Sequence, residues 1–360
     1  MAALVRLLVI LMATLQTTGP LSVGVCYGLL GDDLPPAKEV IALYESRRIR
    51  LMRLYDPNPD ALRALAGSSI QLLLGVPNSD LQSLASAPAN AHSWVQTNLK
   101  SHTTVSFRYI AVGNEVSPIA GSPTADLSQY VLPAMQNINA AIKSAGLGNR
   151  RIKVSTAIDM TLLGNSYPPS AGAFRDDVRA YMDPIIEFLT QEKGPLLANV
   201  YPYFSHAGNP TDIPLPYALF TAPATVVRDQ ECEYRNLFDA MVDAVYSALE
   251  RAGGGAVEVV VSESGWPSGG GVATTVENAR IYNTNLASHV SRGTPKRPGK
   301  GIETYLFAMF DENEKEPEVE KHWGLFFPTM RQKYSLDFFG RATAGLSASA
   351  NVNSSSINLR

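Results

Sequence analysis

Eight short apolar runs, most of them followed by a stretch with helical spacing, constrain the fold more than any other feature of the sequence. The runs cover residues 22–28, 49–56, 70–78, 109–116, 152–158, 196–204, 257–263 and 302–311. They are almost continuously apolar, which is typical of parallel strands that are covered on both faces. Eight strand-and-helix units in this order predict an α/β fold with one (β/α)8 TIM barrel.

The helical stretches support this fold by their spacing. The strongest of them cover residues 130–145, 178–192, 237–251 and 275–290. An open, doubly wound sheet is the alternative, but it usually carries a glycine-rich phosphate turn after the first strand, and none follows residue 28. The stretch after the eighth run is polar from 312 to 321, so the last helix is predicted to be weak.

The two ends of the chain differ in composition from its body. Residues 1–21 combine one arginine with a short apolar run, which predicts a secretory signal peptide, with a buried first helix as the alternative. Residues 22–339 form the predicted barrel domain. Residues 340–360 are small and polar, which predicts a disordered tail. The tail carries a glycosylation sequon at Asn353 and no apolar segment, so no membrane anchor is expected.

Charge and cysteine content exclude several function classes. The net charge of −3 gives no electrostatic case for binding nucleic acid or an anionic membrane. Two cysteines, Cys26 and Cys232, are too few for a disulfide framework or a zinc site. The five histidines show no metal-ligand spacing, and the sequence has no Gly-x-Ser-x-Gly nucleophile motif. No metal or other cofactor is expected.

Two of the predicted strands end in a glutamate. The stretch VEVVVSESGWPS places Glu263 at the end of the seventh strand, and RYIAVGNEV places Glu115 at the end of the fourth. Strict alternation puts Glu263 on the same face as Val261. The carboxyl ends of barrel strands meet at one mouth, where the catalytic residues of such barrels lie. We therefore expect the two carboxylates to face each other there, a few ångströms apart.

Two facing carboxylates suit the hydrolysis of a glycosidic bond. One would protonate the leaving oxygen, and the other would meet the developing positive charge at the sugar carbon. A separation of about 5 Å would make the second one a nucleophile and retain configuration. The alternative is structural, with Glu115 and Glu263 each capping a loop or pairing with an arginine.

Aromatic and charged side chains gather at the same predicted mouth. The aromatic ones are Tyr27, Tyr55, Tyr201, Tyr203, Phe204, Trp266 and Phe310. Flat rings with polar edges suit sugar faces, although ordinary packing is the alternative, above all for Phe204 and Phe310. In the loop after the eighth strand, Glu312 and Lys315 are candidate partners of Glu263.

Six motifs together identify a family resemblance. They are GVCYG (24–28), RLYD (53–56), VGNEV (112–116), NVYPYF (199–204), VVVSESGWPS (259–268) and ETYLFAMFDEN (303–313). Over residues 22–339 the chain resembles the plant endo-β-1,3-glucanases of glycoside hydrolase family 17. The resemblance implies a (β/α)8 barrel with a groove for β-glucan at the C-terminal face of its strands.

The resemblance also implies roles for single residues. Glu115 would be the proton donor and Glu263 the nucleophile of a retaining reaction that needs no cofactor. The residues implied to bind substrate or to support the site are Tyr55, Asn114, Tyr201, Trp266, Glu312, Lys315 and Glu320. The acidic spacer between Glu312 and Glu320 and the stretch around Cys232 depart from the family pattern.

Some alternatives stay open at this stage. The same chemistry could act on mixed-linkage β-1,3;1,4-glucan, because the motifs carry the reaction and the groove walls set the linkage. A catalytically silent glucan-binding protein is the third possibility. A monomer in the secretory pathway is expected, destined for the cell wall or the vacuole.

Overall fold

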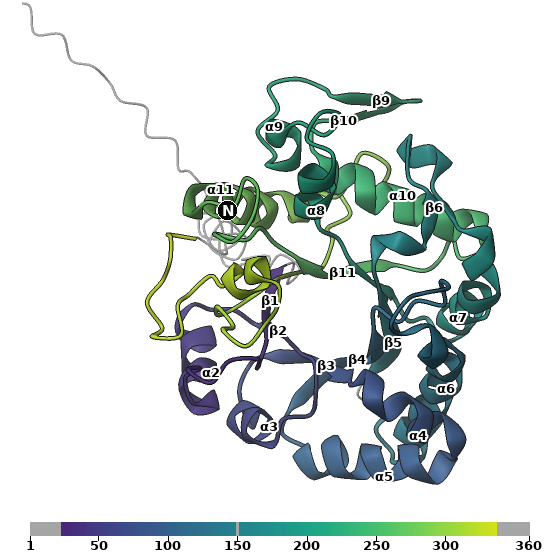
Figure 1. Ribbon diagram of the computed structural model, residues 1–360. Coiled ribbons are helices and arrows are strands. Elements are labelled where there is room, and N and C mark those ends of the chain that lie inside the picture. The colour runs from purple at the N-terminus through teal and green to yellow at the C-terminus, as the bar shows by residue number, and fades with distance from the viewer. Residues whose placement is uncertain (1–22, 149–150, 337–360) are drawn as a thin grey trace, which may run out of the picture.

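The computed structural model describes residues 23–148 and 151–336, and within them eight parallel strands close into one barrel (Figure 1). The expected signal peptide, residues 340–360 and Asn353 lie outside the described residues. Around the barrel the strands follow the order β1-β12-β11-β8-β5-β4-β3-β2. Their bounds are β1 (Val23–Tyr27), β2 (Leu51–Leu54), β3 (Gln71–Val76), β4 (Ser106–Asn114), β5 (Lys153–Ile158), β8 (Leu196–Asn199), β11 (Val259–Ser264) and β12 (Thr304–Leu306). The predicted (β/α)8 barrel is confirmed.

Helices surround the barrel and bury their apolar faces against it (Figure 1). The main ones are α2 (Ala37–Ser46), α3 (Pro59–Leu65), α4 (Leu81–Ser86), α5 (Pro88–Asn98), α6 (Ser128–Ser144), α7 (Arg179–Glu192), α10 (Leu237–Arg251) and α11 (Val276–His289). Helices α3 and α10 begin after asparagines, Asn58 and Asn236, whose side chains accept hydrogen bonds from free backbone N–H groups of the first turn. The sequence therefore sets these helix starts locally.

The sixth and eighth predicted strands are too long. Strand β8 stops at Asn199, because Pro202 begins the short helix α8 (Pro202–Gly208), and proline has no N–H to donate to a strand ladder. Strand β12 stops at Leu306, and the following chain is irregular. In place of a last helix, the described chain forms the 3-10 turn η9 (Glu318–His322).

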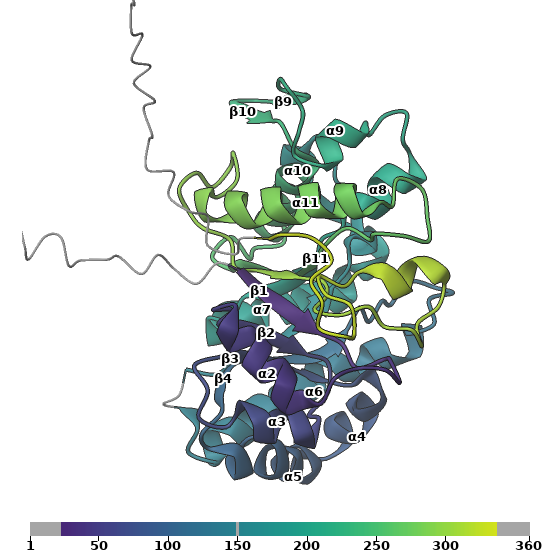
Figure 2. The same cartoon turned by 90° about the vertical axis from the view of Figure 1, so that its left-hand side faces the viewer.

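Two small hairpins were not predicted. They are β6 (Leu163–Asn165) with β7 (Ala173–Phe174), and β9 (Val227–Asp229) with β10 (Cys232–Tyr234). Strands of two or three residues are too short to show an alternating pattern. Figures 1 and 2 show the β9–β10 hairpin and α9 (Leu215–Ala218) gathered beside α10, at one edge of the barrel.

None of the helices within residues 23–148 and 151–336 is long and apolar enough to cross a membrane.

Candidate active site

A cleft of about 900 Å³ opens at the carboxyl ends of the barrel strands. The segment at or after every one of the eight strands contributes to its lining. Among the lining residues are Leu30, Arg53, Tyr55, Asn78, Asn114, Glu115, Asp159, Asn199, Tyr201, Phe204, Glu263, Phe307, Glu312, Lys315, Glu320 and Trp323. The cleft thus brings together both predicted catalytic glutamates and all but one of the predicted supporting residues.

Glu263 is held by one cation and two phenols. Its Oε1 atom lies 2.9 Å from Nη1 of Arg53 and accepts a hydrogen bond of 2.8 Å from Tyr55, while Oε2 accepts one of 2.7 Å from Tyr201. Burial raises the pKa values of both tyrosines well above the usual range of a phenol. Both therefore keep their protons and donate hydrogen bonds to the carboxylate. Three donors thus surround a carboxylate that is only 6 % exposed.

A bulge at the end of β11 sets the direction of this carboxylate. The pairing of β11 with β8 shifts between Val261 and Glu263. One residue of β11, Ser262, therefore has no pairing partner on β8, which is the mark of a β-bulge. Ser262 donates to Asn199, and the next residue, Glu263, pairs with Arg53, which also donates to Asn199. Two consecutive side chains therefore reach one cluster, and the strict alternation expected up to Glu263 is wrong at this point.

Glu115 follows β4 in a backbone conformation that is uncommon for a residue with a side chain. Its φ angle is 52°, in the left-handed region, and its N–H donates to the carbonyl of Ala157 at 2.8 Å. Such conformations cost free energy and persist where the surrounding structure enforces them, often at functional sites. Here the turn points a carboxyl group into the cleft.

The pKa of Glu115 is raised from 4.5 to about 7. Burial is the main cause, and the negative charge of Glu263 adds to it. A hydrogen bond of 2.8 Å from Nδ2 of Asn199 acts in the opposite direction, as does the charge of Arg53. The two carboxyl groups of the cleft therefore have different surroundings: Glu263 contacts a guanidinium and two phenols, whereas Glu115 has a raised pKa and keeps its proton closer to neutral pH.

Arg53 and Asn199 connect the two glutamates, although the sequence did not single them out as site residues. Arg53 is 1 % exposed and donates to the side-chain oxygens of Asn199 (3.0 Å) and Asn114 (2.7 Å) as well as pairing with Glu263. In the barrel, β8 with Asn199 and β5 lie between the strands of the two glutamates. A charged residue inside the apolar run IRLMRLYD was the available signal for Arg53.

The predicted cluster after β12 is present. Nζ of Lys315 lies 3.0 Å from Oε2 of the buried Glu312, whose Oε1 accepts a 2.9 Å hydrogen bond from the N–H of Leu30. Burial raises the pKa of Glu320, and the charge of Lys315 opposes this effect. The cluster forms one wall of the cleft, with Lys315 located 4.1 Å from the ring centre of Phe307.

Trp266 does not face the cleft. It is 0 % exposed, packs against Tyr203 and Tyr282, and donates from Nε1 to the carbonyl of Ala273. The sugar contact that its position suggested is therefore wrong, because the Gly-Trp-Pro turn directs its ring into the packing behind the barrel wall.

Trp323, which the sequence did not single out, lines the cleft instead. Phe204 also lines it and is 47 % exposed, whereas Phe310 is buried as expected for packing. Because these differences depend on how loops fold back over the barrel, residue type alone could not reveal them.

Metal binding has little support in residues 23–148 and 151–336, since they hold no group of three or more His, Cys, Asp or Glu side chains that could bind an ion.

Comparison with known proteins agrees with this geometry. A family model described as "Glycosyl hydrolases family 17" matches residues 23–338. The chain belongs to glycosyl hydrolase family 17. Among curated members, it is 59 % identical to a glucan endo-1,3-beta-glucosidase of Pisum sativum, over 90 % of this chain and 86 % of that protein. It is 56 % identical to a basic vacuolar isoform of Nicotiana tabacum, over 94 % of this chain and 91 % of that protein.

Solved family 17 structures match the barrel over nearly its whole length. A beta-1,3-glucanase and allergen of Cryptomeria japonica pollen superposes with a TM-score of 0.85 at 47 % identity, covering 88 % of this chain and 99 % of the other. One of two plant beta-glucan endohydrolases described as having distinct substrate specificities gives a TM-score of 0.83 at 49 % identity, with coverages of 88 % and 100 %.

Proposed function

We propose that this family 17 chain hydrolyses internal β-1,3-glucosidic bonds of β-1,3-glucans and retains the configuration at the sugar carbon. The observation that carries the proposal is a single cleft that holds Glu263, whose carboxylate contacts an arginine and two phenols, and Glu115, whose pKa is raised to about 7. Environments that separate the protonation states of two carboxyl groups mark the acid and the nucleophile of a glycosidase. The names of the relatives point to the β-1,3 linkage.

In the proposed reaction Glu115 gives its proton to the leaving oxygen while Glu263 attacks the sugar carbon and forms a covalent glycosyl-enzyme. Glu115, now ionised, then takes a proton from the water that hydrolyses this intermediate. Tyr55 and Tyr201 fix the carboxylate of Glu263 from both sides, so that its orientation is set before substrate binds. Asn114 would meet a hydroxyl group beside the reacting carbon.

The remaining cleft residues would bind the glucan chain. Phe204, which is 47 % exposed, offers its ring to a sugar face, and the cluster of Glu312, Lys315 and Glu320 offers hydrogen-bonding groups on the wall formed after β12. A cleft lined from all eight strands suits an internal stretch of a polysaccharide.

Release of reducing ends from laminarin, with analysis of product lengths, tests the proposal. An endo-acting β-1,3-glucanase gives a mixture of oligosaccharides from the earliest times. Activity only on a mixed-linkage β-1,3;1,4-glucan would replace the linkage assignment while keeping the mechanism. Glucan binding without hydrolysis of either substrate would favour a silent binding protein and would contradict the proposal.

The location and assembly of the protein are part of the same proposal. Curated relatives from two Nicotiana species are named basic vacuolar isoforms. We propose entry into the secretory pathway, with the vacuole or the cell wall as destination, and action as a monomer. Fractionation of the expressing tissue and light scattering of the purified protein test these points.

The pH dependence of the reaction should follow Glu115. We expect kcat/KM to fall as the pH rises through about 7, because the acid loses its proton there. The folded protein also binds this proton more tightly than the unfolded chain does. The contribution of this group to the free energy of unfolding should therefore decrease as the pH rises from about 4.5, its usual pKa, to about 7, its pKa in the folded protein. Glu115→Gln should remove that decrease.

A matched control for the pH profile is Asp243, whose pKa burial raises to about 6 at a place outside the cleft. Asp243→Asn should leave the alkaline limb of kcat/KM unchanged. An alkaline limb that moves with Asp243 rather than with Glu115 would contradict the assignment of the acid.

Removing the buried cation beside Glu263 should destabilise the protein and slow the reaction. In Arg53→Met the carboxylate loses its charge partner and two asparagines lose a donor, which should cost about 3–5 kcal/mol of folding free energy. Denaturant unfolding measures this change. The control is Arg108→Met, which breaks the ion pair with Glu303 outside the cleft and should leave kcat/KM near that of the wild type. Equal kcat/KM losses in the two folded variants would contradict a special role of Arg53.

A further inference from the structure

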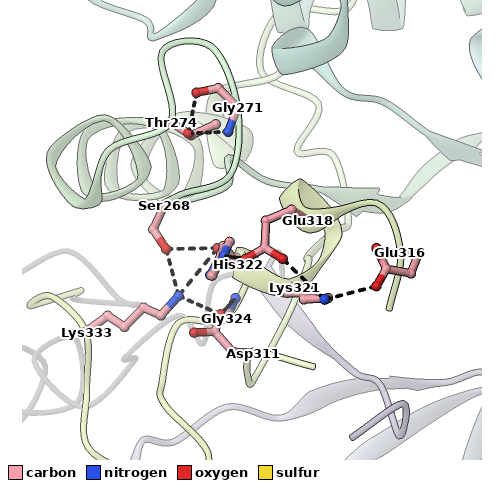
Figure 3. Close-up of polar contacts among 10 residues, drawn as sticks. All are labelled: Ser268, Gly271, Thr274, Asp311, Glu316, Glu318, Lys321, His322, Gly324 and Lys333. Carbon is pink, nitrogen blue, oxygen red and sulfur yellow. Dashed lines mark hydrogen bonds and ion pairs between the residues drawn. The ribbon is translucent and has the colours of Figure 1, made fainter. Parts of the chain in front are cut away.

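A buried lysine lies behind the cleft wall, where three loops meet (Figure 3). The side chain of Lys333 is 1 % exposed, and its Nζ lies 2.6 Å from Oδ1 of Asp311, 2.7 Å from Oγ of Ser268 and 3.4 Å from the carbonyl oxygen of His322. Removing an ammonium group from water is costly, and a buried ion pair contributes little net stability. We call these four residues the Lys333 cluster.

The Lys333 cluster joins three loop segments that each lie next to a residue of the cleft along the chain. Ser268 follows Glu263 in the β11–α11 loop, Asp311 precedes Glu312, and His322 precedes Trp323. Besides the bonds to Lys333, both the N–H and the Oγ of Ser268 donate to the carbonyl of His322 at 2.9 Å. The cluster therefore sets the distances between these loops.

Trp323 is fixed from both sides by this cluster. The carbonyl of His322, before it, accepts from Ser268 and Lys333, and the N–H of Gly324, after it, donates to Oδ1 of Asp311 at 3.0 Å. Both neighbours appear with the cluster in Figure 3. The backbone of the tryptophan thus has little freedom to rotate or shift.

The ring of Trp323 contacts the residue that binds the predicted nucleophile. Its centroid lies 5.1 Å from that of Tyr201 in an edge-to-face arrangement, and Tyr201 donates a 2.7 Å hydrogen bond to Oε2 of Glu263. A continuous path of contacts leads from Lys333 through Trp323 and Tyr201 to the carboxylate. A displacement of the tryptophan would loosen the hydrogen bond that orients Glu263.

The other ion pairs of this region cannot replace the buried lysine. Lys321 pairs with Glu316 and Glu318, and His322 contacts Glu318, but both glutamate side chains are well exposed (Figure 3). Exposed pairs of this kind contribute little to stability and often nothing measurable.

We propose that Lys333 is a positioning residue of the hydrolytic reaction, which acts through Trp323 and Tyr201 on the orientation of Glu263. The proposal rests on the function proposed above. It assigns a role in catalysis to a side chain that never touches the substrate and that lies some 70 residues after the glutamate in the sequence.

The test compares Lys333→Met with Lys333→Arg and with a control, Lys153→Met. Lys153 is partly buried on β5 and donates to the carbonyl of Glu192, outside the cleft. We expect Lys333→Met to lower kcat for laminarin at least tenfold with a smaller change in KM. Lys333→Arg should restore a substantial part of kcat, and Lys153→Met should leave kcat and KM unchanged.

Ser268→Ala serves as a milder variant in case Lys333→Met fails to fold. It removes one acceptor of Lys333 and one bond to His322, so a smaller fall in kcat with little change in KM is expected. Wild-type kcat in folded Lys333→Met, or in Ser268→Ala if the first variant does not fold, would overturn the inference. A wild-type protein that hydrolyses no β-glucan would instead overturn the proposed function. In that case, the fluorescence of Trp323, obtained as the difference between spectra recorded with and without Trp323→Phe, still tests the cluster. A red shift of this difference in Lys333→Met would show that the cluster holds the ring, and no shift would overturn the inference.

Discussion

Replacing Glu263 with glutamine is expected to lower kcat on laminarin by roughly four to six orders of magnitude, the scale of loss when a catalytic nucleophile is removed. The amide cannot form the covalent intermediate, and its single oxygen can replace only one of the two carboxylate oxygens that accept hydrogen bonds from Tyr55 and Tyr201. The loss should appear in kcat rather than in KM. Reducing-sugar release measures it, with circular dichroism to confirm the fold.

The control for this variant is Glu303→Gln. Glu303 is a carboxylate paired with Arg108 and bonded by Tyr305, and it does not line the cleft. Its replacement should lower stability but leave kcat within a few-fold of the wild type. Hydrolysis at the wild-type rate by Glu263→Gln would show that the nucleophile lies elsewhere.

The stereochemistry of azide rescue gives an independent test of the same residue. In Glu263→Ala, azide can enter the space of the missing carboxylate and attack an activated β-glycoside directly, which should give an α-glycosyl azide. A β-configured product from this variant would contradict the role of nucleophile.

Replacing Glu115 with glutamine should lower kcat by about 10²–10⁴-fold, the contribution usual for general acid–base catalysis. The effect should depend on the leaving group, because an aryl glycoside with an acidic phenol needs no protonation. We therefore expect a near-normal first step on such a substrate and a large loss on laminarin. Pre-steady-state measurement of phenol release separates the two steps.

Azide should rescue Glu115→Ala with the opposite stereochemistry. It attacks the glycosyl-enzyme that Glu263 has already formed, so the product should be a β-glycosyl azide. An equal loss on aryl glycosides and on laminarin would contradict the assignment of Glu115 as the acid.

Most of the barrel could be predicted because its pattern is local. The strands are buried on both faces and therefore continuously apolar, and helices α3 and α10 begin after asparagines that cap their first turns. The prediction was wrong at two strand ends, where a proline or a β-bulge interrupts the regular strand pattern. Pro202 ends the sixth strand early, and the bulge at Glu263 changes the face that its side chain takes.

The sequence by itself determined the fold class and the placement of Glu115 and Glu263 at one mouth of the barrel, because the carboxyl ends of all strands in a parallel barrel meet there. Only the tertiary structure decided which other side chains share the cleft. Arg53 and Asn199 join it because two asparagines and a carboxylate converge on one guanidinium. Likewise, Trp323 faces the cleft and Trp266 does not, since loops distant in sequence fix the direction of each ring. Such contacts depend on chain segments that meet only when the barrel closes, and no local pattern records them.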